Sequence, residues 1–387
     1  MTRAPRVLGM MSGTSADGLD AVLLELSHFP ALGSLTKAPS LELAVPRARV
    51  LEHLYTPYPD DLRDWVLAAM QDKIGVSSLT QLSFALGDFY AESVKDLARE
   101  ADLIASHGQT VYHIPRLDTA RDWIVRSTLQ IGDPAALALQ TGKPVISDFR
   151  AADLVAGGQG APLVPFADRI FFAESGVRRA IHNLGGISNL TYLPGLDASG
   201  VLAFDTGPAN CLIDETMNRL GQRFDDGGKI AASGKLEPKL LELWQQDPYL
   251  ELVPPKSTGR EYWMLEKLPS VFELSPKDIV ANVTALTAFT IADQYRRFVQ
   301  PHGLDEILVA GGGTSNIVLM QHLTSSLDVP IVRLEDSKFG QYGFTSATRE
   351  AAAFALLGYY AFQGWENTLP YTTGAARAVI AGRLTKP

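Results

Sequence analysis

Two short apolar runs open the chain, and a polar turn separates them. The first run is Val7–Met11 and the second is Ala21–Leu26, while residues 12–20 between them are rich in Gly, Ser, Thr and Asp. Apolar runs of this length, bounded by turn residues, are typical of β-strands. The pattern therefore predicts an N-terminal β-hairpin.

The remainder of the first half alternates between helical and extended patterns. Apolar residues recur at helical spacing over Ser77–Glu100, and the next run, Asp102–Ser106, predicts a strand that ends at the sequence SHGQT. A further apolar run, Pro144–Ser147, ends at Asp148, and a helix is expected over Leu163–Ala173. Gly, Pro, Ser and Thr content predicts loops at Ala31–Ser40 and Pro370–Ala376.

The second half begins the same plan again. Arg178–Leu184 and Ile187–Leu193 are apolar runs joined by a Gly–Gly turn, and a third run, Val201–Phe204, ends at Asp205. They predict a second hairpin followed by a strand. The later elements are expected to be helices Ala209–Gly221 and Pro276–Val299, strand Glu306–Ala310, and helices Ser315–Ser325 and Thr345–Tyr360.

Two hairpin-led halves indicate an α/β chain with an internal pseudo-repeat. We expect one domain from residues 1–172 together with a returning helix at about 345–362, and a second from residues 173–344. A doubly wound nucleotide-binding fold is the main competing arrangement. Against it, the first strand is not followed by G-x-G-x-x-G, and the sequence has no G-x-x-x-x-G-K-[ST].

Composition and charge exclude some classes of protein. A length of 387 residues suits two domains, and 46% hydrophobic with 20% charged residues is ordinary for a globular protein. The single cysteine, Cys211, excludes an internal disulfide, and a net charge of −9 argues against a nucleic-acid-binding protein. The sequence has neither a membrane-length apolar run nor a signal-like start, so we expect a cytoplasmic protein with no membrane partner.

The first hairpin turn has the composition of a phosphate-binding loop. Its glycines allow backbone N–H groups to close around an anion, its hydroxyls add donors, and a carboxylate can hold Mg²⁺ near phosphates. An ordinary polar hairpin turn has a similar composition. The candidate nucleotide-binding residues here are Gly13, Thr14, Ser15, Ala16, Asp17, Gly18, Leu19 and Asp20.

Several motifs, in a fixed order, resemble those of the anhydro-N-acetylmuramic acid kinase family. The first is MSGTSADGLD at residues 11–20, and the others extend over most of the chain. They are SHGQT (106–110), TLQIGDP (128–134), DFR (148–150), GGQGAPLVP (157–165), NLGGISNLT (183–191), FDTGPAN (204–210), AGGGTSN (310–316) and a late Glu350. The resemblance implies the duplicated, ribonuclease H-like fold of sugar kinases, actin and Hsp70, with a central cleft.

The resemblance also implies ATP and Mg²⁺ as cofactors. We expect Asp17 and Glu350 to lie at the metal, since Mg²⁺ keeps several waters and takes few protein carboxylates. Without the resemblance, Glu350 is a helix N-terminal acid stabilised by the helix dipole, and Asp20 is a turn residue. The other nucleotide-binding residues expected are Gly185, Gly186, Asn189, Asp205, Thr206, Gly207, Asn210, Gly311, Gly312, Gly313 and Asn316.

Asp148 is the predicted catalytic base. It ends a strand, where a partly desolvated carboxylate can accept a proton, and the resemblance places the base at this DFR position. An Asp148–Arg150 ion pair holding the loop is the structural alternative. The expected substrate-binding residues are His107, Gln109, Arg150 and Gln159, the last in a flexible Gly-rich loop. Ala209 replaces a glycine that is common in the family, which places the local turn in question.

The reaction implied is phosphorylation with ring opening. Water attacks the anomeric carbon of 1,6-anhydro-N-acetylmuramic acid, the 1,6 bridge opens, and the freed O6 takes the γ-phosphate of ATP to give N-acetylmuramic acid 6-phosphate, in peptidoglycan recycling. A levoglucosan-type anhydrosugar kinase and a non-catalytic sugar or nucleotide sensor of the same fold are the alternatives. The resemblance is also compatible with a homodimer.

Overall fold

The fold consists of two units, each built around its own β-sheet. The computed structural model describes residues 3–13, 15–34, 37–41 and 46–387. Unit 1 comprises Met1–Phe172 and Phe339–Pro387, and unit 2 comprises Ala173–Lys338. The return to unit 1 thus starts at Phe339, and the assignment of functional domains from the sequence stays a prediction.

The sheet of unit 1 combines a three-stranded antiparallel meander with parallel strands. Its order is β12-β6-β4-β1-β2-β3, with β5 paired to β4. Strands β1, β2 and β3 are antiparallel, whereas β4 runs parallel to β1 and β6 parallel to β4. The strands are β1 (Arg6–Ser12), β2 (Gly18–Leu26), β3 (Ala48–Pro57), β4 (Leu103–Ile114), β5 (Ser127–Ile131), β6 (Val145–Ser147) and β12 (Arg383–Thr385).

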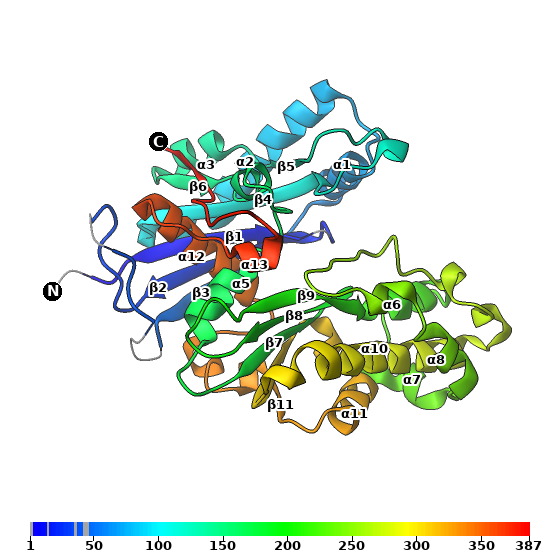
Figure 1. Cartoon of the computed structure of the whole chain (residues 1–387). Coiled ribbons are helices and arrows are strands. Elements are labelled where there is room, and N and C mark those ends of the chain that lie inside the picture. Colours follow the sequence, from blue (N-terminus) through cyan, green and yellow to red (C-terminus); the bar gives the residue numbers. More distant parts are fainter. Residues whose placement is uncertain (1–2, 14, 35–36, 42–45) are drawn as a thin grey trace. The chain divides into compact units, whose positions relative to one another are not determined.

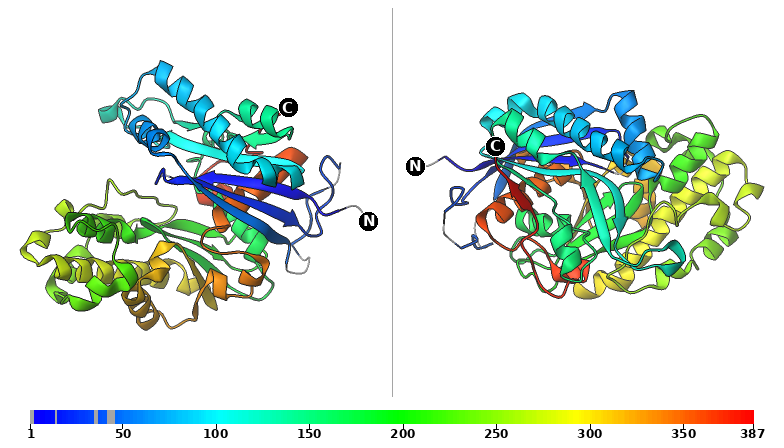
Figure 2. Two further views of the ribbon diagram at one scale, coloured as in Figure 1. Left: turned by 180° about the vertical axis from the view of Figure 1, so that it is seen from behind. Right: turned by 90° about the horizontal axis from the view of Figure 1, so that it is seen from above.

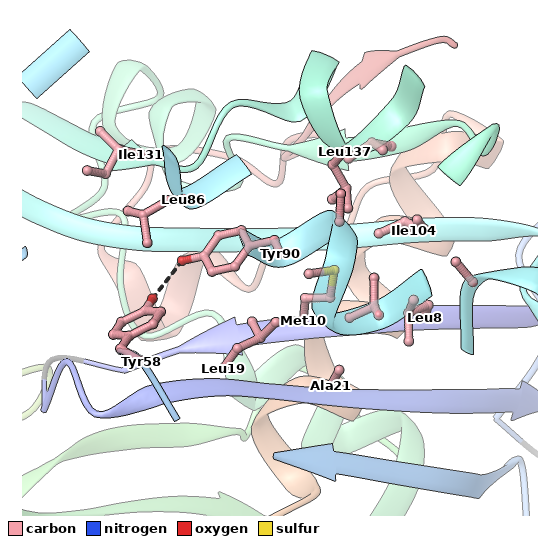
Figure 3. Close-up of a cluster of buried hydrophobic side chains, with 14 of the residues drawn as sticks. Leu8, Met10, Leu19, Ala21, Tyr58, Leu86, Tyr90, Ile104, Ile131 and Leu137 are labelled. Atoms are coloured by element: carbon pink, nitrogen blue, oxygen red, sulfur yellow. Dashed lines mark hydrogen bonds between the residues drawn. The ribbon is translucent and has the colours of Figure 1, made fainter. Parts of the chain in front are cut away.

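Helices cover both faces of this sheet. In Figures 1 and 2, α1 and α2 lie on one side of the blue strands and α12 on the other. Figure 3 shows the first interface, where Tyr90 of α2 lies beside Met10 of β1; Leu86 and Leu8 belong to the same buried cluster. The helices of unit 1 are α1 (Asp60–Met70), α2 (Val76–Glu100), α3 (Pro134–Thr141), α4 (Ala151–Val155), α5 (Val164–Phe172), α12 (Arg349–Gln363) and α13 (Pro370–Thr373).

The interface between α12 and β1 depends on a glycine. A Cβ atom at Gly9 would lie 2.0 Å from the carbonyl oxygen of Ala351 and 2.7 Å from the amide nitrogen of Ala355. No side chain fits such a gap, so the helix backbone lies directly on the strand. This contact fixes the first turns of α12, which carry Glu350, beside the end of the first hairpin.

Unit 2 repeats the topology of unit 1. Its sheet order is β11-β10-β7-β8-β9, with β7, β8 and β9 antiparallel and β10 and β11 parallel to β7. The strands are β7 (Arg179–Leu184), β8 (Ile187–Leu193), β9 (Leu202–Pro208), β10 (Glu306–Ala310) and β11 (Ile331–Arg333). The helices are α6 (Asn210–Arg219), α7 (Lys229–Ser233), α8 (Pro238–Trp244), α9 (Pro248–Glu251), α10 (Pro276–Phe298) and α11 (Ile317–Ser326).

The shared strand order confirms the predicted fold class. In each unit a meander leads into strands parallel to its first strand, which is the duplicated, ribonuclease H-like plan of sugar kinases, actin and Hsp70. Both predicted hairpins are present. No helix in the described part of the chain has the length and apolar character needed to cross a membrane.

Some predicted boundaries are wrong. Strand β4 continues through the whole of SHGQT to Ile114, and β9 continues past Asp205 to Pro208. The late helix begins at Arg349 instead of Thr345, and part of a predicted loop forms the short helix α13. In the other predicted loop, residues 35–36 lie outside the described residues. Strands β3, β5, β11 and β12 are not predicted from the sequence at all.

Candidate active site

The turn of the first hairpin follows the carboxyl end of β1. Ser15 and Asp17 are exposed there, and Ser15 Oγ donates a hydrogen bond of 2.8 Å to Asp17 Oδ1. The left-handed residue of the turn is Ala16, with φ of 50°, and Thr14 lies outside the described residues. Gly13 is partly buried and has room around it. The turn therefore presents hydroxyl and carboxylate groups on its outer side.

Three other residues of this turn that are predicted to bind nucleotide, Ala16, Gly18 and Leu19, pack inside unit 1. The side chains of Ala16 and Leu19 belong to the hydrophobic core. A Cβ atom at Gly18 would lie 2.5 Å from the carbonyl oxygen of Thr56, so this glycine permits the close approach of β3. Only the backbone at these three positions is compatible with the predicted contact.

Carboxylates gather between the first hairpin and the start of α12. Burial raises the pKa of Asp20, the hydrogen bond with His53 opposes this, and the Asp17 charge adds to the increase. Burial also raises the pKa of Glu350; Arg349 and Arg150 oppose it and Asp20 adds to it. A cation among these acids would relieve their repulsion.

The acidic group fits Mg²⁺ in its donor chemistry. Among the described residues no three His, Cys, Asp or Glu side chains already converge on one point. Mg²⁺ prefers one or two carboxylates completed by water and phosphate oxygens. Asp17 and Glu350 thus remain the predicted ligands, with Asp20 as a neighbouring charge.

Gln109 supports the hairpin from inside and does not face a ligand. It is fully buried, its Oε1 accepts from Ser12 Oγ at 2.7 Å, and its Nε2 donates to the carbonyl of Gly13 at 3.2 Å. Direct substrate contact by Gln109 is therefore not supported in this conformation. The reason is the extension of β4, which places Gln109 inside a strand next to β1 instead of at a strand end.

His107 is also buried inside β4, and it contacts Arg150. Arg150 Nε donates to His107 Nε2 at 3.0 Å, and burial, followed by the Arg150 charge, keeps the pKa of His107 well below its usual range. Burial lowers the pKa of Arg150 to about 10. The Asp148–Arg150 pair, the structural alternative, is absent from the interactions of the described residues, because Arg150 turns towards His107.

The Gly-rich loop at residues 157–160 is fastened at nearly every residue. Its backbone exchanges hydrogen bonds with Arg126, Arg150, Asp153 and Thr373. The side chain of Gln159 accepts from Arg116 at 3.3 Å. These contacts differ from the flexible loop that the sequence predicts, although they leave the Gln159 amide group near the surface.

Asp148 lies directly after β6 in a left-handed conformation, with φ of 57°. Its side chain is 29% exposed, and its Oδ2 pairs with Nε of Arg383 at 2.9 Å. Both residues line a surface depression of about 440 Å³ together with Arg377. The desolvated surroundings expected of a catalytic base are therefore not found around Asp148.

The glycine turn of the second hairpin is occupied by contacts within unit 2. The amides of Ala209 and Cys211 donate to the carbonyl of Gly186, and the amide of Asn210 donates to that of Gly185. The amides of Ala209, Asn210 and Cys211 at the start of α6 thus already have partners within unit 2. Ala209 has φ of −122°, outside the region that favours glycine, so alanine is compatible with this turn.

Asp205 is the carboxylate among the predicted site residues of unit 2, and its pKa is strongly shifted. Burial raises its pKa to about 7, while the amide of Thr258, which donates to Oδ2 at 2.8 Å, opposes the increase. No hydrogen bond to Oδ1 is found within the described part of the chain. Asn189 of β8 lies opposite Asp205 in the sheet.

The two residues after Asp205 serve the interior of unit 2. Thr206 is fully buried and exchanges a hydrogen bond of 2.6 Å with Ser188. Gly207 has φ of 136° and lies against Thr290. Side-chain contact between Thr206 and a nucleotide is therefore not supported.

A cavity of about 340 Å³ in unit 2 brings together three of the predicted nucleotide residues. Asn210, Gly312 and Asn316 line it, from the start of α6 and from the Gly-rich turn after β10. Gly311 and Gly313 form the base of that turn, where Cβ atoms would collide with Leu184. The remaining lining residues are Ile213, Asp214, Phe224, Asp225, Asp226, Gly227 and Ser315.

The structure adds residues that the sequence patterns missed. Burial raises the pKa of Asp214 to about 6, and Arg260 opposes this. The guanidinium group of exposed Arg260 lies against Gly186, where a Cβ atom would be 2.4 Å from Nη2. Thr258, whose amide donates to Asp205, lies two residues before Arg260. No glycine-rich or apolar pattern marks the segment of residues 258–260, so only the three-dimensional contacts identify it.

Sequence comparison finds one family over almost the whole chain. The model of the family described as anhydro-N-acetylmuramic acid kinase matches residues 5–387. A protein of that name from Caldanaerobacter subterraneus subsp. tengcongensis is 38% identical, covering 98% of this chain and 96% of the relative. Another, from Bacillus cereus strain AH820, is 36% identical, covering 98% and 99%.

Comparison with solved structures finds proteins that share little sequence with this chain, for example at 12% identity. Component A of (R)-2-hydroxyglutaryl-CoA dehydratase from Acidaminococcus fermentans aligns with a TM-score of 0.43 at 12% identity, covering 93% of this chain and 99% of that chain.

Proposed function

The chain belongs to the anhydro-N-acetylmuramic acid kinase family, and we propose that it converts 1,6-anhydro-N-acetylmuramic acid and ATP to N-acetylmuramic acid 6-phosphate and ADP. The family match over residues 5–387 carries this proposal. Such a kinase acts in the recycling of peptidoglycan sugars. Relatives at 36–38% identity over nearly the full length of both chains bear the same name.

The cavity in unit 2 suits the nucleoside part of ATP. Its lining includes Asp214, Asp225 and Asp226 but no Lys or Arg, so it favours hydroxyl and amine donors over phosphates. Phe224 offers an exposed aromatic surface for a base. Arg260, which supplies a guanidinium group beside Gly186, would then bind phosphate oxygens.

Mg²⁺, when bound, supplies positive charge next to the phosphates. Asp17 and Glu350 are the residues we propose to hold it. The protein's own contribution is to keep Glu350 close to the first hairpin turn, which carries Asp17, through the contact of α12 with β1.

Two carboxylates are candidates for the proton acceptor. In the proposed reaction a carboxylate takes a proton from water as the water oxygen bonds to the anomeric carbon; the bond from that carbon to O6 breaks, and O6 bonds to the γ-phosphorus as ADP leaves. Asp148 is the candidate from the sequence. Asp205 fits better, because its pKa of about 7 and its free Oδ1 suit proton transfer near neutral pH.

The direct test is turnover with defined sugars and analysis of product mass. With 1,6-anhydro-N-acetylmuramic acid, a product heavier by one water and one phosphoryl group would support the proposal. Turnover with levoglucosan alone would indicate the second type of anhydrosugar kinase. Binding of sugar and ATP without turnover would favour the sensor.

We also propose that the protein is a cytoplasmic homodimer. Size-exclusion chromatography with light scattering would measure its mass in solution and so test the number of subunits.

A further inference from the structure

The tautomer of His107 is fixed by its two hydrogen bonds. Nε2 accepts from Arg150 Nε at 3.0 Å, so the ring proton lies on Nδ1, which is 2.8 Å from the carbonyl oxygen of Gly108. The ring also packs on Phe354 of α12, with centroids 4.6 Å apart. Both nitrogens are used and the side chain is only 3% exposed, so His107 has no group left for a substrate.

Arg150 also forms a hydrogen bond with the Gly-rich loop at residues 157–160. Its Nη1 donates to the carbonyl of Gly160 at 2.7 Å, and the amide of Gly160 donates to Asp153 Oδ2 at 2.8 Å. Asp153 Oδ1 in turn accepts from Thr373 Oγ1 at 2.7 Å. A continuous chain of hydrogen bonds therefore links strand β4, the loop at residues 157–160 and helix α13.

Two of the five N–H groups of Arg150 are thereby committed to neighbours. No hydrogen bond from its Nη2 is found among the described residues. The negative charge of Glu350 raises the pKa of the same guanidinium group, against the effect of burial. Rotation of the guanidinium group would break both of its bonds at once. The third nitrogen is therefore held in one direction by the bonds of the other two.

We propose that His107 is a positioning residue: it holds Arg150 and the loop at residues 157–160 in the geometry that binds the sugar. This inference rests on the proposed function for its kinetic test. In this proposal His107 acts through Arg150 and does not touch the substrate, whereas the sequence predicts that it does. Arg150 and Gln159 remain the residues that meet the ligand.

Two substitutions separate the two hydrogen bonds of His107. In His107→Gln the side-chain oxygen lies about where Nε2 was and can still accept from Arg150. In His107→Asn the side-chain amide replaces Nδ1 and keeps the Gly108 bond, but no acceptor reaches Arg150. Both variants lose the ring contact with Phe354, so the comparison isolates the acceptor.

We expect His107→Asn to raise the KM for 1,6-anhydro-N-acetylmuramic acid at least about tenfold, with the KM for ATP changed less than about twofold. His107→Gln should stay within about threefold of the wild type. Adding His107→Asn to Arg150→Met should cause no further loss, since the partner is already gone. Equal sugar KM values in the Gln and Asn variants would overturn the proposal.

Hydrogen exchange tests the same inference without turnover. In the ligand-free full chain, amides 157–160 should exchange faster in His107→Asn than in the wild type or in His107→Gln. Unchanged exchange in His107→Asn overturns the positioning role, whatever the enzyme does. Absence of wild-type turnover with the anhydrosugar, combined with the expected exchange, would instead reject the proposed function and keep the positioning role.

Discussion

At the scale of single residues, the protonation of Asp205 connects the interior of unit 2 to the pH dependence of activity. With a pKa of about 7, half of these side chains carry a proton at neutral pH. A base must be deprotonated to act, so kcat/KM should increase with pH and level off above about 7.

Substitution decides between the two candidate bases. We expect Asp205→Asn to reduce turnover by at least about a hundredfold while Asp148→Asn keeps most of it, as measured by coupled ADP release. ATP binding, followed by calorimetry, should survive in Asp148→Asn. Loss of turnover in Asp148→Asn alone would restore the prediction made from the sequence.

The same carboxyl group should affect stability with a definite sign. Its pKa rises from 3.8 to about 7 on folding, so the folded state holds the proton more tightly than the unfolded state. The contribution to stability is complete below pH 3.8 and is lost as the pH increases through about 7. Between pH 4 and 8 the free energy of unfolding of the wild type, measured with urea, should therefore fall by at most about 4 kcal/mol more than that of Asp205→Asn. Asn189→Ser, which changes an uncharged neighbour and keeps Asp205, is the control and should show the same loss with pH as the wild type.

Asp168 and Arg349 form a buried ion pair that fixes the start of α12. Arg349 Nε donates to Asp168 Oδ1 at 2.8 Å, and both side chains are buried. Asp168→Ala leaves the guanidinium charge without its partner, which we expect to reduce the free energy of unfolding by about 3–5 kcal/mol.

The matched control is an exposed pair. Glu251 pairs with Arg297 at 3.1 Å and is largely solvated, so Glu251→Ala should cost about 1 kcal/mol or less. Equal losses of unfolding free energy in the two variants, measured with urea at pH 7, would contradict the expected difference between the buried and the exposed ion pair.

At the scale of elements, the close approach of α12 and β1 makes a simple prediction. Gly9→Ala puts a methyl group 2.0 Å from the carbonyl oxygen of Ala351, so helix and strand must separate. We expect a loss of about 3 kcal/mol or more and a lower Tm. Gly75→Ala, where no atom lies within 4 Å of the new methyl group, should leave the Tm nearly unchanged. A normal Tm for Gly9→Ala would mean that α12 is not held in this way.

Elements with strong patterns could be predicted, and those without could not. The hairpins and α2 follow from apolar runs and helical spacing, which act locally. Strand β3 has one face largely exposed, and β12 has three residues paired only with β6, so their formation depends on partners distant in sequence. The same limit applies to the site, since Gly-rich turns mark Asn210 and Asn316, whereas Arg260 and Asp214 become neighbours only after folding.

At the scale of the whole molecule, the two units differ in how they are assembled from the chain. Unit 2 is one continuous segment with its own cores, whereas unit 1 needs two segments. We expect a fragment of residues 173–338 to unfold cooperatively by circular dichroism. A fragment of residues 1–172 should not, unless residues 339–387 are added. Cooperative unfolding of residues 1–172 alone would contradict this.

The split of unit 1 also has a consequence during synthesis. Helix α12 covers one face of the first sheet, yet it is translated only after all of unit 2. At about 5–20 residues per second, ribosomes need roughly 10–30 s to make the intervening segment. Throughout that interval the nascent first sheet has one apolar face without its helix, which makes it a client for chaperones on the ribosome, and a premature stop before codon 349 would leave it permanently uncovered.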